Sequence, residues 1–533
     1  MDCKATRLPY RQTNSFSKTV LDYIDNTDGL KLFYSQPPTL QGIQKAIAER
    51  KKFPTNRKNL VEELYKQYDG IVQSEKVKKN IDLLLSENTF TVTTAHQNNI
   101  FTGPLYFIYK IVHAIRLADH FKKSMPEHDF VPVFYMGSED ADLEELNHIY
   151  LGGEKFVWGT KQTGAVGRMK VDKGLVNLID LMEGQLAVLP NGKEIIAQLK
   201  ENYKIGTTVE EATFHFVNAL FAEFGLIVLL PDKSSLKKQM IKLFEDDLLN
   251  QTASAIVEGS AKKLTTAGYK VQASPREINL FYLIDDKRDR IEKVNGEWQI
   301  VNNNKKFTQD ELLKELNEFP ERFSPNVILR GLYQETILPN ISFIGGGGET
   351  AYWLQLQDLF DHYKVPFPVL VLRNSFLIVE KKWQTLIARL GFTTEDIFLP
   401  EQELINRLVA RETNNKLKLN GTYAETEQLY DLIKKQATTI DVTLEKHVEA
   451  LKSQTLRRLQ QLEKKMLRAE KRKFSDQQRQ IHTIKENLFP GNGLQERKEN
   501  LSYYYAKWGK GFIDNLYTHS LRLEQEFVVL LEK

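Results

Sequence analysis

The chain lacks the features that mark several classes of protein. Its 533 residues include a single cysteine, Cys3, so intrachain disulfides and cysteine-rich zinc clusters are excluded. No apolar run approaches the roughly 20 residues that span a bilayer, and no apolar stretch follows the opening Met-Asp-Cys-Lys-Ala-Thr-Arg. The sequence therefore predicts a cytoplasmic protein without a membrane partner, in which any metal site would need His, Asp or Glu ligands.

Neither positive nor negative charge is in large excess. Lys and Arg number 73 and Asp and Glu 70, and this net charge of +3 gives no overall argument for nucleic acid or an anionic membrane as a partner. The hydrophobic fraction of 41% and the aromatic fraction of 10% are ample for a packed interior. At about 150 residues per domain, the length predicts two to four structural units.

Short apolar runs, several of them β-branched, alternate with helical patterns through the middle of the chain. Such alternation predicts an α/β fold with a mostly parallel sheet that is covered on both faces. A hairpin is expected within residues 271–301, because Asn295-Gly296 separates two polar-alternating runs there. The predicted strands are residues 89–95, 131–136, 226–230, 341–344 and 369–372, and two of the predicted helices are 105–121 and 349–363.

The C-terminal part reads as a long helical arm. Residues 426–488 contain neither proline nor glycine, and their apolar positions are spaced largely by threes and fours, as a coiled coil requires. This arm would be an antiparallel hairpin, a dimer contact, or both. We expect an N-terminal helical segment at 1–88, a core at 89–425 with insertions at about 150–224 and 265–320, and the arm with a returning helix at 426–533.

The first candidate motif for ligand binding runs from His96 to Tyr106, directly after a predicted strand. Ligands of parallel sheets bind at the carboxyl ends of strands, where helix N-termini offer free N–H groups. Gly103 would let a phosphate approach, and Pro104 would start the helix. An ordinary strand-to-helix turn with a satisfied histidine explains the same residues equally well.

Acidic side chains follow the strand at 131–136. Glu139 and Asp140 would lie at the same edge of the sheet, where they suit a substrate ammonium or a magnesium ion; N-capping and dipole compensation are the alternative. Asp142, Glu145 and His148 are spaced by threes, as a metal set on one helix face would be. Acidic helix starts are common, so no metal ligand is assigned.

Four glycines, Gly345 to Gly348, follow the strand at 341–344 and precede Glu349. The Gly-Lys-Ser/Thr ending of a Walker loop is absent, which disfavours a P-loop nucleotidase. Glycines here could serve close helix–strand contact, or they could let backbone approach a ligand. Four in a row cost considerable backbone entropy, which favours the ligand.

Two further clusters are candidates. Arg373, followed by Asn374 and Ser375, ends the strand at 369–372 and could bind phosphate or carboxylate with two hydrogen bonds, or form a structural ion pair. The aromatic cluster that contains Tyr505 and Trp508 could stack an adenine ring, although aromatic side chains at such a junction more often only fill the core.

Together these motifs resemble the bacillithiol-synthesis cysteine ligase family (BshC). They occur in the family's order along nearly the whole chain. The matching segments are Phe101 to Tyr106 with Tyr109-Lys110, Val131 to Phe134 leading to Gly137-Ser138-Glu139-Asp140, Leu332 to Asn340, Gly345 to Trp353, Leu372 to Ser375, and Leu488 to Pro490 with Leu494 to Arg497.

The resemblance implies a Rossmann-like core related to nucleotidyltransferases and class I tRNA synthetases, with insertions and a dimerising coiled coil. It also implies ligation of L-cysteine to glucosaminyl-malate, the last step towards bacillithiol, driven by ATP with magnesium. The family commonly has a histidine where this chain has Ala141, and His96 is a candidate to replace it.

By analogy with synthetases, ATP would convert the cysteine carboxylate into an acyl-adenylate or acyl-phosphate that the glucosamine amine attacks. Positioning and charge stabilisation would be the protein's part. The expected catalytic residues are His96, Glu139, Asp140, Glu349 (a possible general base) and Arg373. The expected nucleotide-binding residues are Gly103, Pro104, Tyr106, Lys110, Gly345, Gly346, Gly347, Asn374, Ser375, Tyr505 and Trp508.

Two other functions fit parts of the sequence. Residues 445–480 hold 11 Lys/Arg against 5 Asp/Glu, a basic arm of the kind that grips RNA, although a solvated surface has the same composition. A non-catalytic scaffold with the arm as its working part is the second alternative. Nucleic acid is not the expected partner; cysteine, glucosaminyl-malate and a second copy of the chain are.

Overall fold

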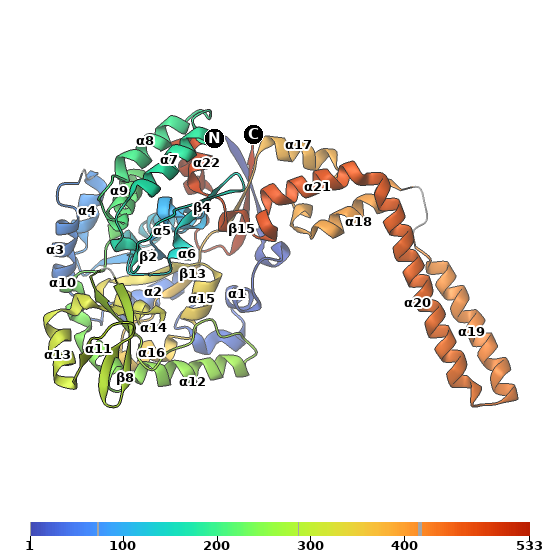
Figure 1. The fold of residues 1–533 in the computed structure, drawn as a ribbon, viewed down its shortest axis with the longest axis horizontal. Helices are drawn as coiled ribbons and strands as arrows, with labels where there is room; N and C mark the ends of the chain where they lie inside the picture. The colour runs from blue at the N-terminus through green and yellow to red at the C-terminus, as the bar shows by residue number, and fades with distance from the viewer. Residues whose placement is uncertain (1, 72–73, 286, 414–417) are drawn as a thin grey trace. The chain divides into compact units, whose positions relative to one another are not determined.

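The structure, a computed structural model, describes residues 2–71, 74–285, 287–413 and 418–533. The chain folds into two compact units, residues 1–378 with 493–533 and residues 379–492, whose elements are labelled in Figure 1. Among the described residues, no helix has the length and apolar character needed to cross a bilayer.

The core of the first unit is a five-stranded parallel sheet in the order β13-β12-β2-β3-β6. Its strands are the five that the sequence predicts, since each is an apolar or β-branched run bounded by polar residues or glycine. The α/β prediction is therefore confirmed. The strands are β2 (Thr89–Gln97), β3 (Asp129–Gly137), β6 (Ile227–Leu229), β12 (Asn340–Gly345) and β13 (Val369–Leu372).

Helices bury apolar side chains against this sheet. One cluster joins Ile43 of α2 (Leu40–Arg50), Phe121 of α5 (Tyr106–Ser124), and Phe90 and Val92 of β2. The other helices of this unit before residue 340 are α1 (Lys18–Ile24), α3 (Arg57–Gln67), α4 (Glu75–Leu83), α6 (Leu143–Leu146), α7 (Lys173–Leu186), α8 (Gly192–Asn202), α9 (Val209–Phe221), α10 (Ser234–Lys237), α11 (Ile241–Leu249), α12 (Thr252–Thr266), α13 (Gln309–Glu318) and α14 (Val327–Ile337).

The helix expected at 349–363 is instead two helices, α15 (Gly347–Trp353) and α16 (Gln357–Tyr363). Trp353 lies between them, with rings of Phe343 and Phe360 against it at 4.5 and 5.6 Å between centroids. The buried indole at the end of α15 thus contacts both β12 and α16.

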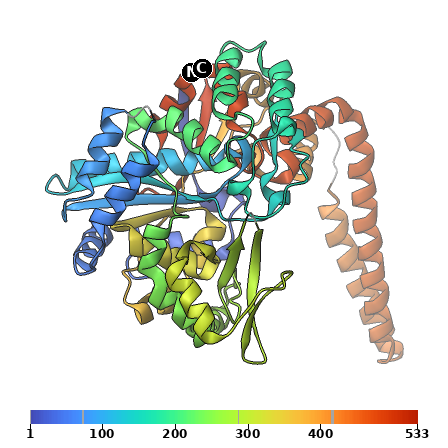
Figure 2. The ribbon, with the colours of Figure 1, turned by 60° about the vertical axis from the view of Figure 1, so that its left-hand side comes forward.

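The predicted hairpin insertion is a five-stranded antiparallel sheet, β10-β9-β8-β7-β11, whose long hairpin is yellow-green in Figure 2. Asn295 and Gly296 form its turn with φ of +52° and +86°, a left-handed pair that this dipeptide tolerates. The strands are β7 (Leu280–Ile284), β8 (Lys287–Val294), β9 (Glu297–Ile300), β10 (Lys306–Phe307) and β11 (Phe323–Pro325); a smaller hairpin is β4 (His148–Leu151) with β5 (Glu154–Val157).

The N-terminal segment differs from the helical expectation. Cys3–Pro9 forms β1, which pairs antiparallel with β15 (Glu526–Glu532) in a sheet completed by β14 (Phe376–Val379). The pairing partner lies at the other end of the sequence, so no local pattern indicates it.

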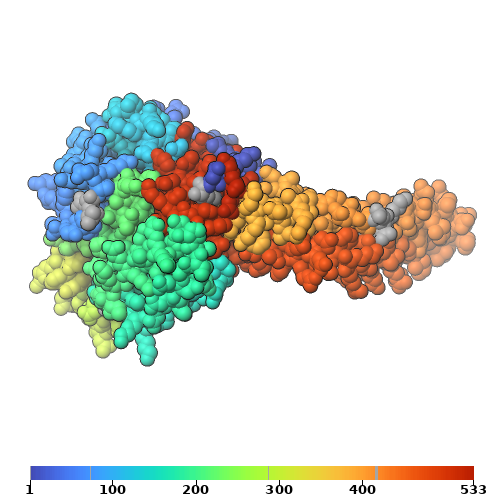
Figure 3. Space-filling model, turned by 90° about the horizontal axis from the view of Figure 1, so that it is seen from above, coloured from blue at the N-terminus to red at the C-terminus, as the bar shows by residue number. Residues whose placement is uncertain are grey.

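The chain after residue 493 returns to the first unit. Gln495 accepts a hydrogen bond from the Ile378 N–H at 3.0 Å and donates one to its carbonyl at 3.2 Å. Then follow α22 (Leu501–Trp508) and α23 (Lys510–His519), and the red C-terminal segment lies beside the green segment of α7 and α8 in Figure 3.

The second unit is helical, and its helices are α17 (Lys381–Arg389), α18 (Glu401–Glu412), α19 (Asn420–Ile440), α20 (Leu444–Lys471) and α21 (Ser475–Leu488). α19 and α20 run side by side as an antiparallel pair (Figure 1). Ion pairs of Lys434 with Glu449 and of Lys452 with Asp431 join the two helices. The turn is made without glycine or proline, because Asp441 accepts hydrogen bonds from the Thr443 N–H and hydroxyl.

This unit begins earlier than the arm expected from residue 426. It begins at Val379, because α17 and α18 pack against α21, and it ends at Asn492. The segment after it, where a returning helix is expected, belongs to the first unit, so the arm is an excursion from the core.

Truncation of the core residue Phe121, which is fully buried, should show how strongly α5 holds the sheet. Phe121→Ala is expected to lower the free energy of unfolding by about 3–5 kcal/mol, because it removes buried ring contacts and leaves a cavity. Urea unfolding followed by circular dichroism measures this. Leu32→Ala, at an 81% exposed side chain, is the control and should change little; equal losses would contradict the core assignment.

Candidate functional site

A cavity of about 570 Å³ lies at the carboxyl ends of β2, β3, β12 and β13. The chain builds β2, β3 and β6 in one direction across the sheet and then places β12 and β13 on the other side of β2. The order therefore reverses between β12 and β2, and in open α/β sheets ligands bind in the crevice at such a reversal.

The cavity brings together predicted residues from four separate strand ends. The sequence analysis predicts that these strand ends lie at one edge of the sheet. Those that line it are His96, Tyr106, Lys110, Asp140, Gly346, Gly347, Glu349 and Arg373.

Lys110 and Glu349 form a buried ion pair at the reversal point. The Lys110 side chain is 2% exposed and also donates to the Ala95 carbonyl at 2.9 Å. Burial lowers the pKa of Lys110, and the neighbouring Glu349 carboxylate opposes that shift. Glu349 in turn accepts from the Gly346 N–H at 2.8 Å, so the start of α15 carries a carboxylate of the protein itself.

His96 sits beside this pair as a neutral ring. Its Nδ1 lies 3.5 Å from Lys110 Nζ, and burial together with the Lys110 charge holds the pKa of His96 well below its usual value. Since an ammonium can only donate, Nδ1 is the accepting nitrogen and the proton resides on Nε2. Among the described residues, nothing hydrogen-bonds this buried Nε2.

Arg373 is held in place by Glu496. Its Nη2 donates to Glu496 Oε1 at 2.7 Å and its Nη1 to the Asn374 carbonyl at 3.0 Å, while the guanidinium lies 5.2 Å from the Tyr106 ring centroid. The buried Nε has no hydrogen-bond partner in the described part of the chain. A Cβ built on Gly346 would stand 3.4 Å from that Nε, so the start of α15 lies directly beside this donor.

Glu139 and Asp140 have different surroundings. Glu139 is buried and accepts from Lys237 Nζ at 2.5 Å; Lys237 also binds Asp232 at 2.7 Å, so Glu139 belongs to an internal charge network. Asp140 faces the cavity and accepts from Gln97 at 2.8 Å. Burial would raise the pKa of Asp140, but Arg330 at 3.6 Å and this hydrogen bond hold it below its usual value.

The possible metal set does not share a helix face. Asp142 caps the single turn of α6, Glu145 lies within it, and His148 already begins β4. Within the described ranges, no group of three or more His, Cys, Asp or Glu side chains is arranged to hold a metal ion.

Gly103 and Pro104 lie outside the cavity. The Phe101 and Gly103 carbonyls accept from Asn500 Nδ2 at 2.9 and 2.6 Å, which ties this loop to the returning C-terminal segment. Gly103 has φ of +58°, and a Cβ there would stand 2.7 Å from Asn99 Cβ. The glycine is explained by this close contact.

The remaining predicted residues are placed behind or away from the cavity. Ser375 donates to Glu496 at 3.0 Å and Asn374 accepts from Ser520, while Gly345 is the last residue of β12 and does not line the cavity. Tyr505 donates to Glu194 at 2.6 Å, and Trp508 stacks on Tyr504 and Phe512. The aromatic pair is part of the core contacts of α22, as the alternative interpretation held.

Sequence reasoning missed most of the arginines. The cavity is lined by six cationic side chains and three carboxylates, and four of the cations are Arg276, Arg288, Arg330 and Arg497. Arg276 and Arg288 come from the antiparallel insertion, where no motif points to them. Arg497 lies in a segment that carries the family resemblance, a signal that was available. The surplus of positive charge favours anionic ligands.

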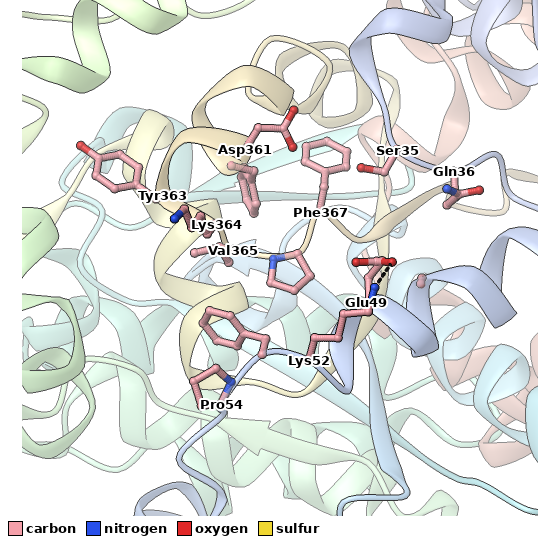
Figure 4. A pocket seen from close by; sticks show the side chains of 14 residues that line it. Ser35, Gln36, Glu49, Lys52, Pro54, Asp361, Tyr363, Lys364, Val365 and Phe367 are labelled. Atoms are coloured by element: carbon pink, nitrogen blue, oxygen red, sulfur yellow. Dashed lines mark hydrogen bonds and ion pairs between the residues drawn. The ribbon is translucent and has the colours of Figure 1, made fainter.

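A second cavity, of about 590 Å³, lies at the amino ends of the strands and is drawn in Figure 4. It contains none of the predicted residues. Beside it, Arg50 donates to the Pro366 carbonyl and forms a buried ion pair with Glu335 at 2.7 Å. The Glu335 carboxylate also accepts a hydrogen bond from the Asn340 side chain. The motif from Tyr333 to Asn340 therefore serves this buried network, far along the strands from the reversal point.

Comparison with known proteins matches both parts of the chain. Residues 1–374 match the model "Bacillithiol biosynthesis BshC, N-terminal Rossmann-like domain", and residues 376–532 the corresponding C-terminal coiled-coil domain. Proteins named "Putative cysteine ligase BshC" are similar over almost their whole length. That of Flavobacterium psychrophilum is 39% identical over 96% of both chains, and that of Flavobacterium johnsoniae 37% over 98% of this chain and 99% of its own.

A solved chain named as an arginyl-tRNA synthetase of Campylobacter jejuni is 9% identical and superposes with a TM-score of 0.22 over 82% of this chain and 94% of its own. Similarity at that level does not establish a shared fold. The expected kinship with class I synthetases stays a prediction.

Removal of the Glu496 charge should destabilise the site. In Glu496→Gln, Arg373 loses its buried carboxylate, and the free energy of unfolding is expected to fall by about 3–5 kcal/mol. Urea denaturation measures the loss. The exposed pair Arg7–Glu526 provides the control, because Glu526→Gln should cost less than about 1 kcal/mol. Similar small losses for both variants would show that the buried pair does not anchor the site.

Proposed function

The chain belongs to the BshC family of bacillithiol biosynthesis, and from this premise we propose that it joins L-cysteine to the amine of glucosaminyl-malate in a reaction driven by ATP. The observation that supports this most directly is the convergence of Lys110, His96 and Arg373 at the strand-order reversal, beside the glycines after β12. Such a crevice suits a nucleotide next to a small carboxylate substrate.

Amide formation requires an activated carboxylate, since the carboxylate oxygen is a poor leaving group. Attack of the cysteine carboxylate on ATP would give an acyl-adenylate with release of pyrophosphate, or an acyl-phosphate with release of ADP. The sugar amine then forms the C–N bond and expels AMP or phosphate, and one proton leaves the amine.

Three donors of the site suit the negative charge that moves onto phosphate during this step. They are the Lys110 ammonium, the free Arg373 Nε–H and the His96 Nε2–H, all held before the substrate arrives. Donors fixed in advance in a partly dry pocket stabilise a developing charge without reorganisation. Neutral His96 acts as a donor, whereas Glu349, already bound to Lys110, orients that lysine.

Asp140 is the carboxylate best placed for the substrate ammonium. Magnesium would enter with ATP, whose phosphates supply most of its ligands, and the lining oxygens available to it are those of Asp140 and Glu145, which share the Gln97 amide at 2.8 and 3.4 Å.

A homodimer through the arm is part of the proposal. Apolar side chains along α19 and the following turn stay exposed although the helix pair is formed, among them Leu429 at 55%, Leu432 at 60% and Ile440 at 85%. Apolar surface of this kind on a helical hairpin is typical of an association face.

The reaction is tested directly with the purified protein. Incubation with cysteine, glucosaminyl-malate and ATP should yield the amide by mass spectrometry, with AMP or ADP in equal amount. Lys110→Met is expected to lower kcat about 100-fold or more, as loss of a charge-stabilising donor does. Lys287→Met, at an exposed lysine, is the matched control. No cysteine-dependent use of ATP would exclude the proposed ligase, and steeply salt-dependent RNA binding would favour the RNA-handling alternative.

The oligomeric state can be tested separately. Leu432→Glu combined with Leu429→Glu should convert a dimer into a monomer, because both charges would be buried at the association face. Light scattering after size-exclusion chromatography gives the mass. Leu32→Glu alters a more exposed leucine of the other unit and should leave the dimer intact; a wild-type monomer would refute this part of the proposal.

A further inference from the structure

The antiparallel insertion contributes its own cationic wall to the cavity. Arg276 precedes β7, Arg288 lies on β8, and Arg330 on α14 faces the same space. None of these three arginines is among the donors proposed for carboxylate activation.

Arg288 is rigidly oriented. Its guanidinium lies 3.9 Å from the centroid of Phe281 on the paired strand β7, its Nε donates to Ser324 Oγ at 2.9 Å, and its Nη2 donates to the Pro325 carbonyl at 3.2 Å. These partners occupy one edge of the planar group. Nη1 is the remaining nitrogen, so a fixed donor is presented without further loss of side-chain freedom.

Arg330 lines the same cavity as Arg288. A Cβ built on Gly137 at the end of β3 would stand 3.5 Å from Arg330 Nη1, so this guanidinium lies beside the strand end. Burial and, next, the charge of Arg330 lower the pKa of Arg288 to about 10.

The pair is poorly neutralised by the protein. Asp140 is 3.6 Å from Arg330, and among the residues the structure describes no carboxylate oxygen lies within 4 Å of Arg288 or Arg276. Like charges in a partly desolvated wall repel each other, and a bound anion removes that cost. The wall is therefore built for a negatively charged group of a ligand.

The position of this wall separates it from the nucleotide crevice. The nucleotide crevice lies on the β12 and β13 side of β2 and contains Lys110, Arg373 and Gly346. The end of β3 lies on the other side of β2, and beside it are Arg330 and Asp140. One cavity thus has two cationic regions, and the second would be redundant if the nucleotide phosphates were the only anions bound.

Hydrogen bonds within the protein also hold the loop that carries Arg276. The buried carboxylate of Asp247 accepts from the Asn279 N–H at 2.6 Å and side-chain amide at 3.0 Å, and Asn279 bonds the backbone of Arg276 on both sides, at 3.1 and 3.0 Å. The loop that carries Arg276 is therefore held against α11 and does not depend on a ligand for its shape.

We propose that Arg288 and Arg330, with Arg276 at the rim, form the subsite that binds the dicarboxylate part of the acceptor substrate. This inference rests on the proposed function, in which the acceptor carries a malate group. Each guanidinium can hold one carboxylate through charge-assisted hydrogen bonds, and two such bonds fix the sugar amine relative to the activated cysteine. The residues of the insertion would then set acceptor specificity.

Steady-state kinetics of Arg288→Gln and Arg330→Gln test the subsite. Each variant is expected to raise KM for glucosaminyl-malate about 10- to 100-fold, the loss typical of one charge-assisted pair, and to change KM for ATP less than about threefold. Arg290→Gln removes the same charge from an exposed position two residues along β8 and should match the wild type. Thermal unfolding confirms that each variant is folded.

Glucosamine without malate gives the second comparison. The wild type should use it far less well than glucosaminyl-malate, and the two arginine variants should no longer distinguish the two acceptors. A rise in KM for ATP with an unchanged KM for the acceptor would assign the arginines to the nucleotide phosphates and overturn the proposal.

Calorimetry with L-malate as the probe separates the subsite from the reaction. Binding to the wild type and to Arg290→Gln, with loss in Arg288→Gln and Arg330→Gln, supports the subsite even if no product forms and the proposed function fails. Absence of malate binding to a wild type that does form product, or equal binding to all four proteins, would refute the subsite alone.

Discussion

The buried pairing of Arg373 with Glu496 is the interaction on which the site depends. The guanidinium at the end of β13 is almost fully buried and needs a carboxylate to neutralise it, and Glu496, with no exposed surface, supplies that charge. The same carboxylate also accepts from the Ser375 hydroxyl and the Phe376 N–H. Three groups of the strand end are thereby satisfied, while the Nε of Arg373 has no partner among the described residues.

Much of the fold follows from local sequence patterns, and the predictions that were wrong concern elements that depend on non-local contacts. The five core strands and the Asn295-Gly296 hairpin each carry their signal within a few residues. The strand Cys3–Pro9 depends on a partner at Glu526–Glu532, the division of the helix after Gly347 depends on the burial of Trp353, and the turn at Asp441 depends on a single side chain that the coiled-coil spacing conceals.

The candidate site shows the same division. A strand end followed by a polar residue or glycine was sufficient to find His96, Asp140, Gly346 and Arg373, because parallel strands bring such positions to one edge. Sequence reasoning could not separate Glu139, which Lys237 holds inside, from its neighbour Asp140, which faces the cavity. Nor could it find Arg288, since the insertion reaches the site only through the three-dimensional course of its hairpin.

The hydrogen bonds between Gln495 and Ile378 have a consequence for how the chain can be divided. They hold the point where the backbone leaves the core beside the point where it comes back, so the residues between them form a closed excursion. Closing such a gap with a short glycine–serine linker costs little conformational entropy. The excursion is therefore a module that can be excised, lengthened or exchanged between homologues while every strand of the parallel sheet keeps its connection.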